Sequence, residues 1–329
     1  MAYEISFITP KVKVADTFVF ETSLWSSEDK MYMAPMHGLT DYYFRNAFAK
    51  VFPCTIDKAI SPFLSLTHGK LEKSTRKFKD LLPINNNNDI ELIPQILGND
   101  INGIIEVANT LKTMGYNEIN WNLGCPFKKI TNKNRGAALL KDNQYIEKVI
   151  SEVFEKTDMH LSLKVRLGYD STEDIFRLIP IVNSYPISSI TIHPRLGVDE
   201  YSSEVDLDIF EEVSKTINKK IIYNGDIKTV DDFKILKNRF PQIKDWMIGR
   251  WLIYNPFLAA QIRGINYPDK MERLIAFNNE LVGSGISVNK IKEFWGYFSK
   301  GLNWEAEKLD KINHLQTIEE ITDYINTQK

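Results

Sequence analysis

The chain has only two cysteines, no long apolar run and no basic leader at its N-terminus. Cys54 and Cys125 are far apart and lack metal-ligand spacing, which argues against a disulfide framework or a metal site and favours a reducing, cytoplasmic setting. No stretch approaches the ~18 uncharged apolar residues that a membrane span requires. A signal peptide needs a basic segment followed by an apolar one, and the N-terminus shows no such pattern. We therefore expect a cytoplasmic protein without a membrane segment.

An excess of positive charge is also missing, because the formal net charge is −2. A nucleic-acid-binding protein is usually basic, at least on one face. The overall charge therefore does not indicate RNA binding. Two local basic clusters do occur, and each fits either a binding patch or a solvated charged face. The first contains His68, Lys70, Lys73, Arg76, Lys77 and Lys79, and the second contains Lys128, Lys129, Lys133 and Arg135.

Short β-rich runs alternate with amphipathic segments along most of the chain. The expected strands are Met31–Ala34, Thr55–Ala59, Glu91–Leu97, Glu118–Asn122, Leu161–Arg166, Ser189–His193, Lys220–Asn224 and Trp246–Ile248. The expected helices include Ile101–Met114, Asn143–Lys156, Thr172–Val182, Asp208–Thr216 and Val230–Arg239. This alternation predicts an α/β fold with a (β/α)8 TIM barrel of the usual ~250 residues. An open doubly wound sheet is the alternative, but it requires a Gly-x-Gly-x-x-Gly turn that the sequence lacks.

The chain divides into three expected segments. Residues 31–265 form the barrel, and residues 266–329 form a small all-helical C-terminal domain. Proline is absent from 269–327, where apolar residues recur at helical spacing, as in Leu274, Phe277 and Leu281. We interpret the aromatic stripe of this domain as core packing. Residues 1–30 are either an extension over the closed end of the barrel or an over-long start, with Met31 as the true beginning.

In such a barrel the active site lies at the carboxyl ends of the strands. The expected seventh and eighth strands end in the glycine turns Asn224-Gly225-Asp226 and Ile248-Gly249-Arg250. Barrels often bind phosphate at this position with backbone N–H groups, and Arg250 would add a charge-assisted bond. Three further polar side chains, Gln95, Lys164 and His193, are directed to the same mouth. Together they favour a phosphorylated, planar heteroaromatic cofactor, with Lys164 stabilising negative charge on a reduced ring.

Cys125 lies between Gly124 and Pro126, in a loop at the catalytic end. A thiol with a pKa of about 8.5 is mostly protonated at neutral pH, so it can donate a proton. It can alternatively act as a nucleophile if nearby His193 or lysines lower its pKa. We interpret Cys54, in the apolar run 51–56, as a small buried hydrophobic residue.

These motifs, taken in order, resemble those of the tRNA-dihydrouridine synthases, and of their bacterial members in particular. The resemblance runs from about Met31 to Gln261. The matching elements are Met33-Ala34-Pro35-Met36 with Gly38, Thr40-Asp41 and Phe44-Arg45, Asn122-x-Gly124-Cys125-Pro126, Lys164-x-Arg166, His193-x-Arg195, Asn224-Gly225-Asp226 and Gly249-Arg250. The Asn-x-Gly-Cys-Pro element is specific by itself, and the ordered set is very specific. One departure is Pro194, where many members have glycine.

The resemblance implies reduction of specific tRNA uridines to dihydrouridine, with bound FMN and with NADPH as reductant. Hydride would pass from reduced FMN to C6 of the uracil, and Cys125 would deliver a proton to C5. The flavin contacts would be Pro35 and Met36 lining it, Gln95, Lys164 and His193 on its ring, Asn122 beside Cys125, and Asn224, Gly225, Asp226, Gly249 and Arg250 on its phosphate tail. The RNA-facing residues would be Lys128, Lys129, Arg135, Arg166 and Arg195. The helical C-terminal domain would help dock the tRNA, and we expect a monomer without metal.

Three other functions share parts of this pattern. An FMN-dependent barrel acting on a free pyrimidine, such as dihydroorotate or dihydrouracil, needs neither the helical domain nor the basic cluster after Cys125. An RNA-binding flavoprotein without catalysis does not require an intact Cys125. A phosphate-binding isomerase or lyase barrel would contain no flavin. The sequence does not indicate which uridine is reduced.

Overall fold

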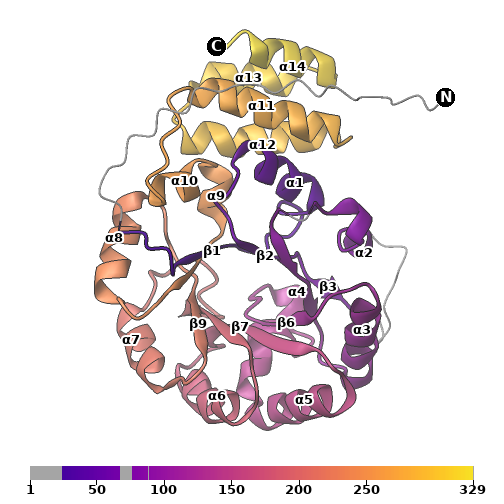
Figure 1. The fold of residues 1–329 in the computed structure, drawn as a ribbon, viewed down its shortest axis with the longest axis vertical. Coiled ribbons are helices and arrows are strands. Elements are labelled where there is room, and N and C mark those ends of the chain that lie inside the picture. The colour runs from indigo at the N-terminus through magenta and orange to yellow at the C-terminus, as the bar shows by residue number, and fades with distance from the viewer. Residues whose placement is uncertain (1–23, 67–75, 88, 329) are drawn as a thin grey trace, which may run out of the picture.

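The structure, a computed structural model, describes residues 24–66, 76–87 and 89–328. Within these residues, ten strands form one curled parallel sheet, in the order β3-β5-β6-β7-β8-β9-β10-β1-β2-β4. The strands are β1 (Lys30–Met33), β2 (Lys58–Ile60), β3 (Leu64–Ser65), β4 (Glu91–Ile93), β5 (Gln95–Leu97), β6 (Glu118–Leu123), β7 (His160–Gly168), β8 (Ser189–Leu196), β9 (Lys220–Tyr223) and β10 (Asp245–Ile248). Figure 1 shows the helices arranged around the outside of this sheet. The predicted (β/α)8 barrel is confirmed.

The barrel closes through the segment that contains β4 and β5. β4 pairs with β2, whereas β5 pairs with β6. Pro94 separates the two strands because it has no N–H to donate to the ladder, yet its carbonyl accepts a hydrogen bond from the Asn120 N–H at 2.8 Å. The single strand expected over 91–97 is therefore interrupted, although its two parts still join the neighbours on either side. The short strand β3 was not predicted.

The helices of the barrel follow the expected strands. They are α1 (Tyr42–Val51), α2 (Arg76–Lys79), α3 (Ile101–Thr113), α4 (Lys128–Thr131), α5 (Asn143–Lys156), α6 (Glu173–Ser184), α7 (Leu207–Thr216), α8 (Val230–Arg239), α9 (Arg250–Tyr254) and α10 (Leu258–Ile262), with 3-10 turns η1 (Pro83–Asn85) and η2 (Gly136–Lys141). All five helices named from the sequence are present within one or two residues of their expected bounds. α1 was not predicted, although it buries Phe44 and Phe48.

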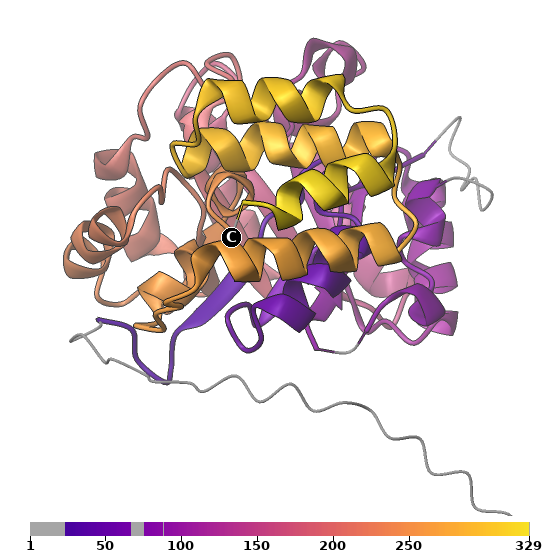
Figure 2. The same cartoon turned by 90° about the horizontal axis from the view of Figure 1, so that it is seen from above.

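Four helices follow the barrel and pack together beside α1 and α9 (Figures 1 and 2). They are α11 (Lys270–Gly283), α12 (Val288–Gly301), α13 (Ala306–His314) and α14 (Ile318–Asn326). Phe277 of α11 meets Phe44 of α1 edge-on, at a centroid distance of 5.4 Å, and Tyr297 of α12 meets Tyr254 of α9 at 5.5 Å. The aromatic stripe is buried, so it forms core packing as predicted. Its apolar contacts join these helices to the barrel.

The N-terminal segment meets the barrel through Trp25 and Asp29. Trp25 lies against the Arg263 guanidinium at 4.5 Å, and Asp29 forms an ion pair with Lys237, so the described end of the N-terminal segment packs on the barrel. The first 23 residues, together with His68, Lys70 and Lys73, lie outside the described residues. Cys54 is exposed, which corrects the prediction that it is buried. None of the described helices is long and apolar enough to cross a membrane.

Candidate active site

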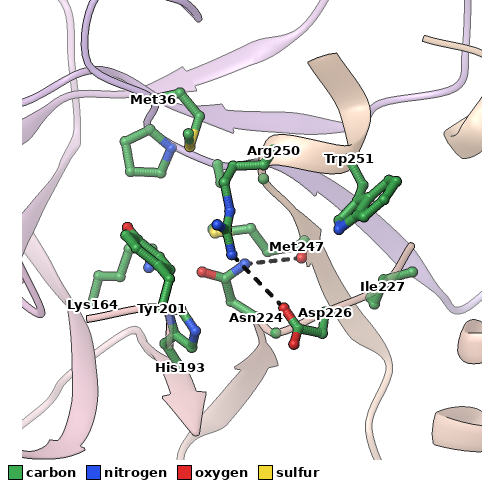
Figure 3. Close-up of a pocket in the computed structure, with 14 residues that line it drawn as sticks. Met36, Lys164, His193, Tyr201, Asn224, Asp226, Ile227, Met247, Arg250 and Trp251 are labelled. Carbon is green, nitrogen blue, oxygen red and sulfur yellow. Dashed lines mark hydrogen bonds and ion pairs between the residues drawn. The ribbon is translucent and has the colours of Figure 1, made fainter. Parts of the chain in front are cut away.

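A pocket with about 550 Å³ of empty volume, part of it open to solvent, lies at the carboxyl end of the barrel strands (Figure 3). Nine of the predicted site residues line it. They are Pro35, Met36, Lys164, His193, Asn224, Gly225, Asp226, Gly249 and Arg250. Five lining residues were missed by sequence reasoning, namely Ala34, Tyr201, Ile227, Met247 and Trp251. Most of these flank the predicted motifs directly, but Tyr201 comes from the loop after β8 and carries no motif of its own.

The two glycine turns bring bare backbone to the pocket. A Cβ at Gly249 would lie 3.6 Å from the Ala34 Cβ and 3.7 Å from the Met36 sulfur, so a side chain there would occupy pocket space. A Cβ at Gly225 would lie 2.9 Å from Val205 Cγ1, closer than real contacts allow. Glycine at 249 therefore leaves room for a ligand to approach the main chain, whereas glycine at 225 is required by the close packing of its turn against Val205 and Pro194.

The charged side chains around these turns leave an excess of positive charge, which favours binding of an anion. The Asp226 carboxylate forms an ion pair with Arg195, and Arg250 Nη2 lies 4.0 Å from its other oxygen. The Arg250 guanidinium also stacks on the Tyr201 ring at 4.2 Å (Figure 3). Two cations thus face one carboxylate, which leaves positive charge available at this end of the pocket.

His193 is neutral because it is buried among cations, one of which lies on the same strand. Arg195 Nη1 lies 2.9 Å from His193 Nε2. Burial, followed by the charges of Arg166 and Lys164, holds the pKa of His193 well below its ordinary value of 6.5. A neutral imidazole that accepts at Nε2 carries its proton on Nδ1.

Lys164 also lines the pocket, and its pKa is shifted as well. Burial, with the nearby Arg166 guanidinium, lowers its pKa from 10.5 to about 7. The ammonium group therefore changes charge near neutral pH. An anionic ligand in the pocket would favour the protonated form, because opposite charges raise the pKa of a lysine.

Cys125 lies in a loop anchored from inside the barrel. The Asn122 side-chain oxygen accepts hydrogen bonds from the Gly124 N–H at 3.1 Å and from the Cys125 N–H at 2.9 Å. Asn122 Nδ2 donates to Gln95 Oε1, and Gln95 Nε2 donates to Asn120 Oδ1, both at 2.8 Å. Gln95 and Asn122 are both buried, and neither lines the pocket. Their observed contacts fix the cysteine loop.

The Cys125 thiol favours the protonated state. Burial raises its pKa above the ordinary value, and the Phe127 backbone N–H and the charges of Arg166, Lys164 and Lys77 offset part of that rise. A raised pKa suits a proton donor, whereas a nucleophilic cysteine needs a lowered one. Of the two roles left open by the sequence, this environment favours proton donation.

The five residues expected to face RNA occupy different environments. Lys128 and Lys129 are exposed. Arg135 is half-buried and donates to Asn99 Oδ1 at 3.0 Å. Arg166 and Arg195 are both buried, with relative exposures of 1% and 4%, and Arg166 donates to the carbonyls of Gly124 and Leu196. The contacts of these two arginines shape the pocket and the cysteine loop from within.

Lys77 of the first basic cluster lies near enough to Cys125 for its charge to act on the thiol. Its ammonium group lies 4.5 Å from the centre of the Phe63 ring, and that ring stacks on His37 at 5.6 Å. Burial, with the charges of Lys77 and Lys290, lowers the pKa of His37. Lys77 comes from α2 and Lys290 from α12, so cations of the barrel and of the C-terminal helices converge on His37.

The chain is similar to dihydrouridine synthases over most of its length. Residues 32–314 match the family described as dihydrouridine synthase (Dus). The probable tRNA-dihydrouridine synthase of Rickettsia conorii is 27% identical over 300 residues, which cover 85% of this chain and 87% of that protein. The tRNA-dihydrouridine(16) synthase of Pseudomonas syringae pv. tomato is 27% identical over 237 residues, which cover 70% and 73%.

Solved structures resemble the chain at the level of the fold. The old yellow enzyme from Trypanosoma cruzi gives a TM-score of 0.52 at 10% identity, covering 74% of this chain and 91% of that one. Histamine dehydrogenase from Rhizobium sp. 4-9 gives a TM-score of 0.54 at 11% identity and covers 78% of this chain. The chain spans about half, 49%, of that larger protein.

Proposed function

Because the chain belongs to the dihydrouridine synthase family, we propose that it reduces tRNA uridines with FMN as its flavin, NADPH as reductant and Cys125 as proton donor. The protein is a flavin-dependent oxidoreductase that forms dihydrouridine in tRNA. The observation that carries the finer proposal is Cys125 in an anchored loop, where burial raises the pKa of its thiol and where the thiol interacts with the charge of Lys164, a residue that lines the pocket.

The donor set fits FMN. Its phosphate would bind the backbone of the turns at Gly225 and Gly249 and the Arg250 guanidinium, and a Cβ at Gly249 would take up part of that space. Its ring would lie toward Pro35 and Met36, with Lys164 and His193 as polar neighbours. Four further residues complete the proposed flavin site. Gln95 and Asn122 hold the cysteine loop, and Asn224 and Asp226 shape the phosphate turn.

Reduced flavin, when bound, supplies the hydride that adds to C6 of the uracil. Cys125 gives its sulfur-bound proton to C5, so the C5–C6 double bond becomes saturated and a thiolate remains. The charges of Arg166, Lys164 and Lys77 stabilise that thiolate until it takes a proton from solvent. Burial keeps the thiol protonated at neutral pH, which prepares it for each turnover.

The residues that contact the RNA are also part of this proposal. The target base must leave its stack to reach a buried sulfur. Lys128 and Lys129 project into solvent beside Cys125 and suit phosphate contacts. The three less exposed arginines would hold the loops beneath this RNA-facing surface in place through their hydrogen bonds; they are Arg135, Arg166 and Arg195. Residues 266–329 would dock the tRNA, and we propose a cytoplasmic monomer whose barrel spans 31–265.

Anaerobic turnover with purified enzyme tests this proposal. The cofactor released by denaturation should be FMN, and NADPH should reduce it faster than NADH does. The wild type should then form dihydrouridine in tRNA isolated from a strain that lacks the gene. The Cys125→Ser variant should retain FMN and its reduction by NADPH but form little dihydrouridine. Equal dihydrouridine formation by both enzymes would contradict the role of Cys125, and release of FAD would contradict the choice of FMN.

A further inference from the structure

Phe127 presents an aromatic ring to solvent two residues after the catalytic cysteine. Its relative exposure is 51%, although it belongs to a loop that is otherwise anchored and largely buried. Six large hydrophobic residues are exposed in the described part of the chain, and Phe127 is the one phenylalanine among them. A single exposed apolar residue is ordinary on a protein surface. Phe127 differs from the other five because it lies two residues after Cys125.

The main chain of Phe127 is held at a defined place relative to the Cys125 sulfur. The Phe127 backbone N–H hydrogen-bonds to the Cys125 sulfur and favours its ionised form. Phe127 is also the N-cap of α4, and its carbonyl accepts from the Ile130 N–H at 2.7 Å. The main chain of Phe127 is therefore fixed on both sides, two residues from the sulfur. Nucleotides that flank a uracil with C5 at the sulfur would pass beside this segment, where the Phe127 side chain is exposed.

The two residues that follow Phe127 provide charge for an RNA backbone. Lys128 and Lys129 are exposed, and neither forms a salt bridge with a carboxylate of the described residues. An exposed aromatic ring beside exposed cations is the combination with which proteins bind single-stranded nucleic acid. The ring stacks on a base, and the cations contact phosphates.

We propose that Phe127 stacks on a base next to the uridine being reduced, while Lys128 and Lys129 contact the flanking phosphates. This inference rests on the proposed function, because it assigns a contact to the same substrate. The stacked base replaces a contact that the RNA loses when the target uridine leaves its own stack. Phe127 thus holds the opened RNA in register with Cys125. Stacking on phenylalanine tolerates any base, so the contact supports positioning more than sequence choice.

Phe127→Leu removes the aromatic face and keeps an apolar side chain, whereas Phe127→Tyr keeps the face. Ile235→Ala, an exposed apolar truncation on α8 with 63% exposure at Ile235, is the matched control. We expect Phe127→Leu to lower kcat/KM for tRNA about tenfold, within the range that stacking on one base supplies. Phe127→Tyr and Ile235→Ala should stay within about twofold of the wild type. FMN content and NADPH oxidation by oxygen should be the same in all four proteins.

A substrate with an abasic nucleotide beside the target uridine completes the test, with the abasic site placed on the 5′ side or the 3′ side. One of the two should lower wild-type kcat/KM to the level of Phe127→Leu, and Phe127→Leu should lose nothing further on it. Additive losses on both substrates, or a Phe127→Leu variant as active as the wild type, would contradict the stacking role of Phe127 and leave the proposed function intact. A wild type that forms no dihydrouridine in any tRNA overturns the proposed function together with this inference.

Discussion

Arg195 Nη1 lies 2.9 Å from Nε2 of His193, within the same strand, β8. A guanidinium group has no acceptor, so the imidazole must accept this hydrogen bond and remain neutral. Arg195 also holds Asp226, which orders the turn after β9. One buried arginine therefore sets the tautomer of a pocket residue and the position of the adjacent turn.

Arg195→Met should raise the pKa of His193 toward its ordinary value of 6.5. The change removes one of the cations that disfavour the imidazolium form, while burial continues to oppose protonation. Histidine NMR signals followed against pH measure this directly. Arg135→Met is the control, because Arg135 is not among the charges that act on His193. An unchanged or lowered pKa in Arg195→Met would contradict the assignment.

Lys77→Met should raise the pKa of the Cys125 thiol. The Lys77 charge favours the thiolate, so its removal should shift the pH midpoint of thiol alkylation upward. The measurement uses iodoacetamide with a Cys54→Ser background, because Cys54 is exposed and would also react. Lys79→Met, on the same helix, should leave the midpoint in place. A midpoint that moves downward, or equally in both variants, would show that Lys77 does not act on the sulfur.

The stability of the flavin-free protein should depend on pH through Lys164. Its folded pKa of about 7 lies below the ordinary 10.5, so between these values the unfolded chain binds a proton that the folded chain does not. The free energy of unfolding should therefore rise with pH above about 7, by at most about 1.4 kcal/mol per pH unit. Lys164→Met should lack this rise, and Lys129→Met should keep it. Urea unfolding from pH 6.5 to 9 checks the difference, and parallel curves for wild type and Lys164→Met would refute it.

Two glycines of α12 should respond in opposite directions to alanine. A Cβ at Gly301 would lie 2.0 Å from the Tyr254 carbonyl oxygen, where α12 meets α9. A Cβ at Gly296 meets nothing within 4 Å. Gly301→Ala should lower the free energy of unfolding by about 1–3 kcal/mol, and Gly296→Ala should raise it by about 0.5–1 kcal/mol. Denaturant midpoints report both. Equal effects at the two positions would contradict the close packing of α12 on α9.

Most strands were predictable because each is a short apolar run bounded by turn residues, and the chain order of a barrel then follows from the βα alternation. The two-residue strand β3 is too short to give such a run. The pocket motifs were predictable for the same reason, since carboxyl strand ends converge at one face. Tyr201 was not predictable, because it reaches the pocket from the middle of a loop whose path depends on tertiary contacts. The burial of Arg166 and the exposure of Cys54 likewise depend on side-chain direction and local backbone, which hydrophobic periodicity does not encode.

Position-resolved mapping of dihydrouridine in tRNA decides whether this protein forms dihydrouridine in cells. The comparison uses cells that lack this gene and the same cells complemented with the wild type or with Cys125→Ala. Our account predicts that one or a few positions lose dihydrouridine, that the wild type restores them and that Cys125→Ala does not. If every position keeps its dihydrouridine in cells without another such synthase, the account is contradicted.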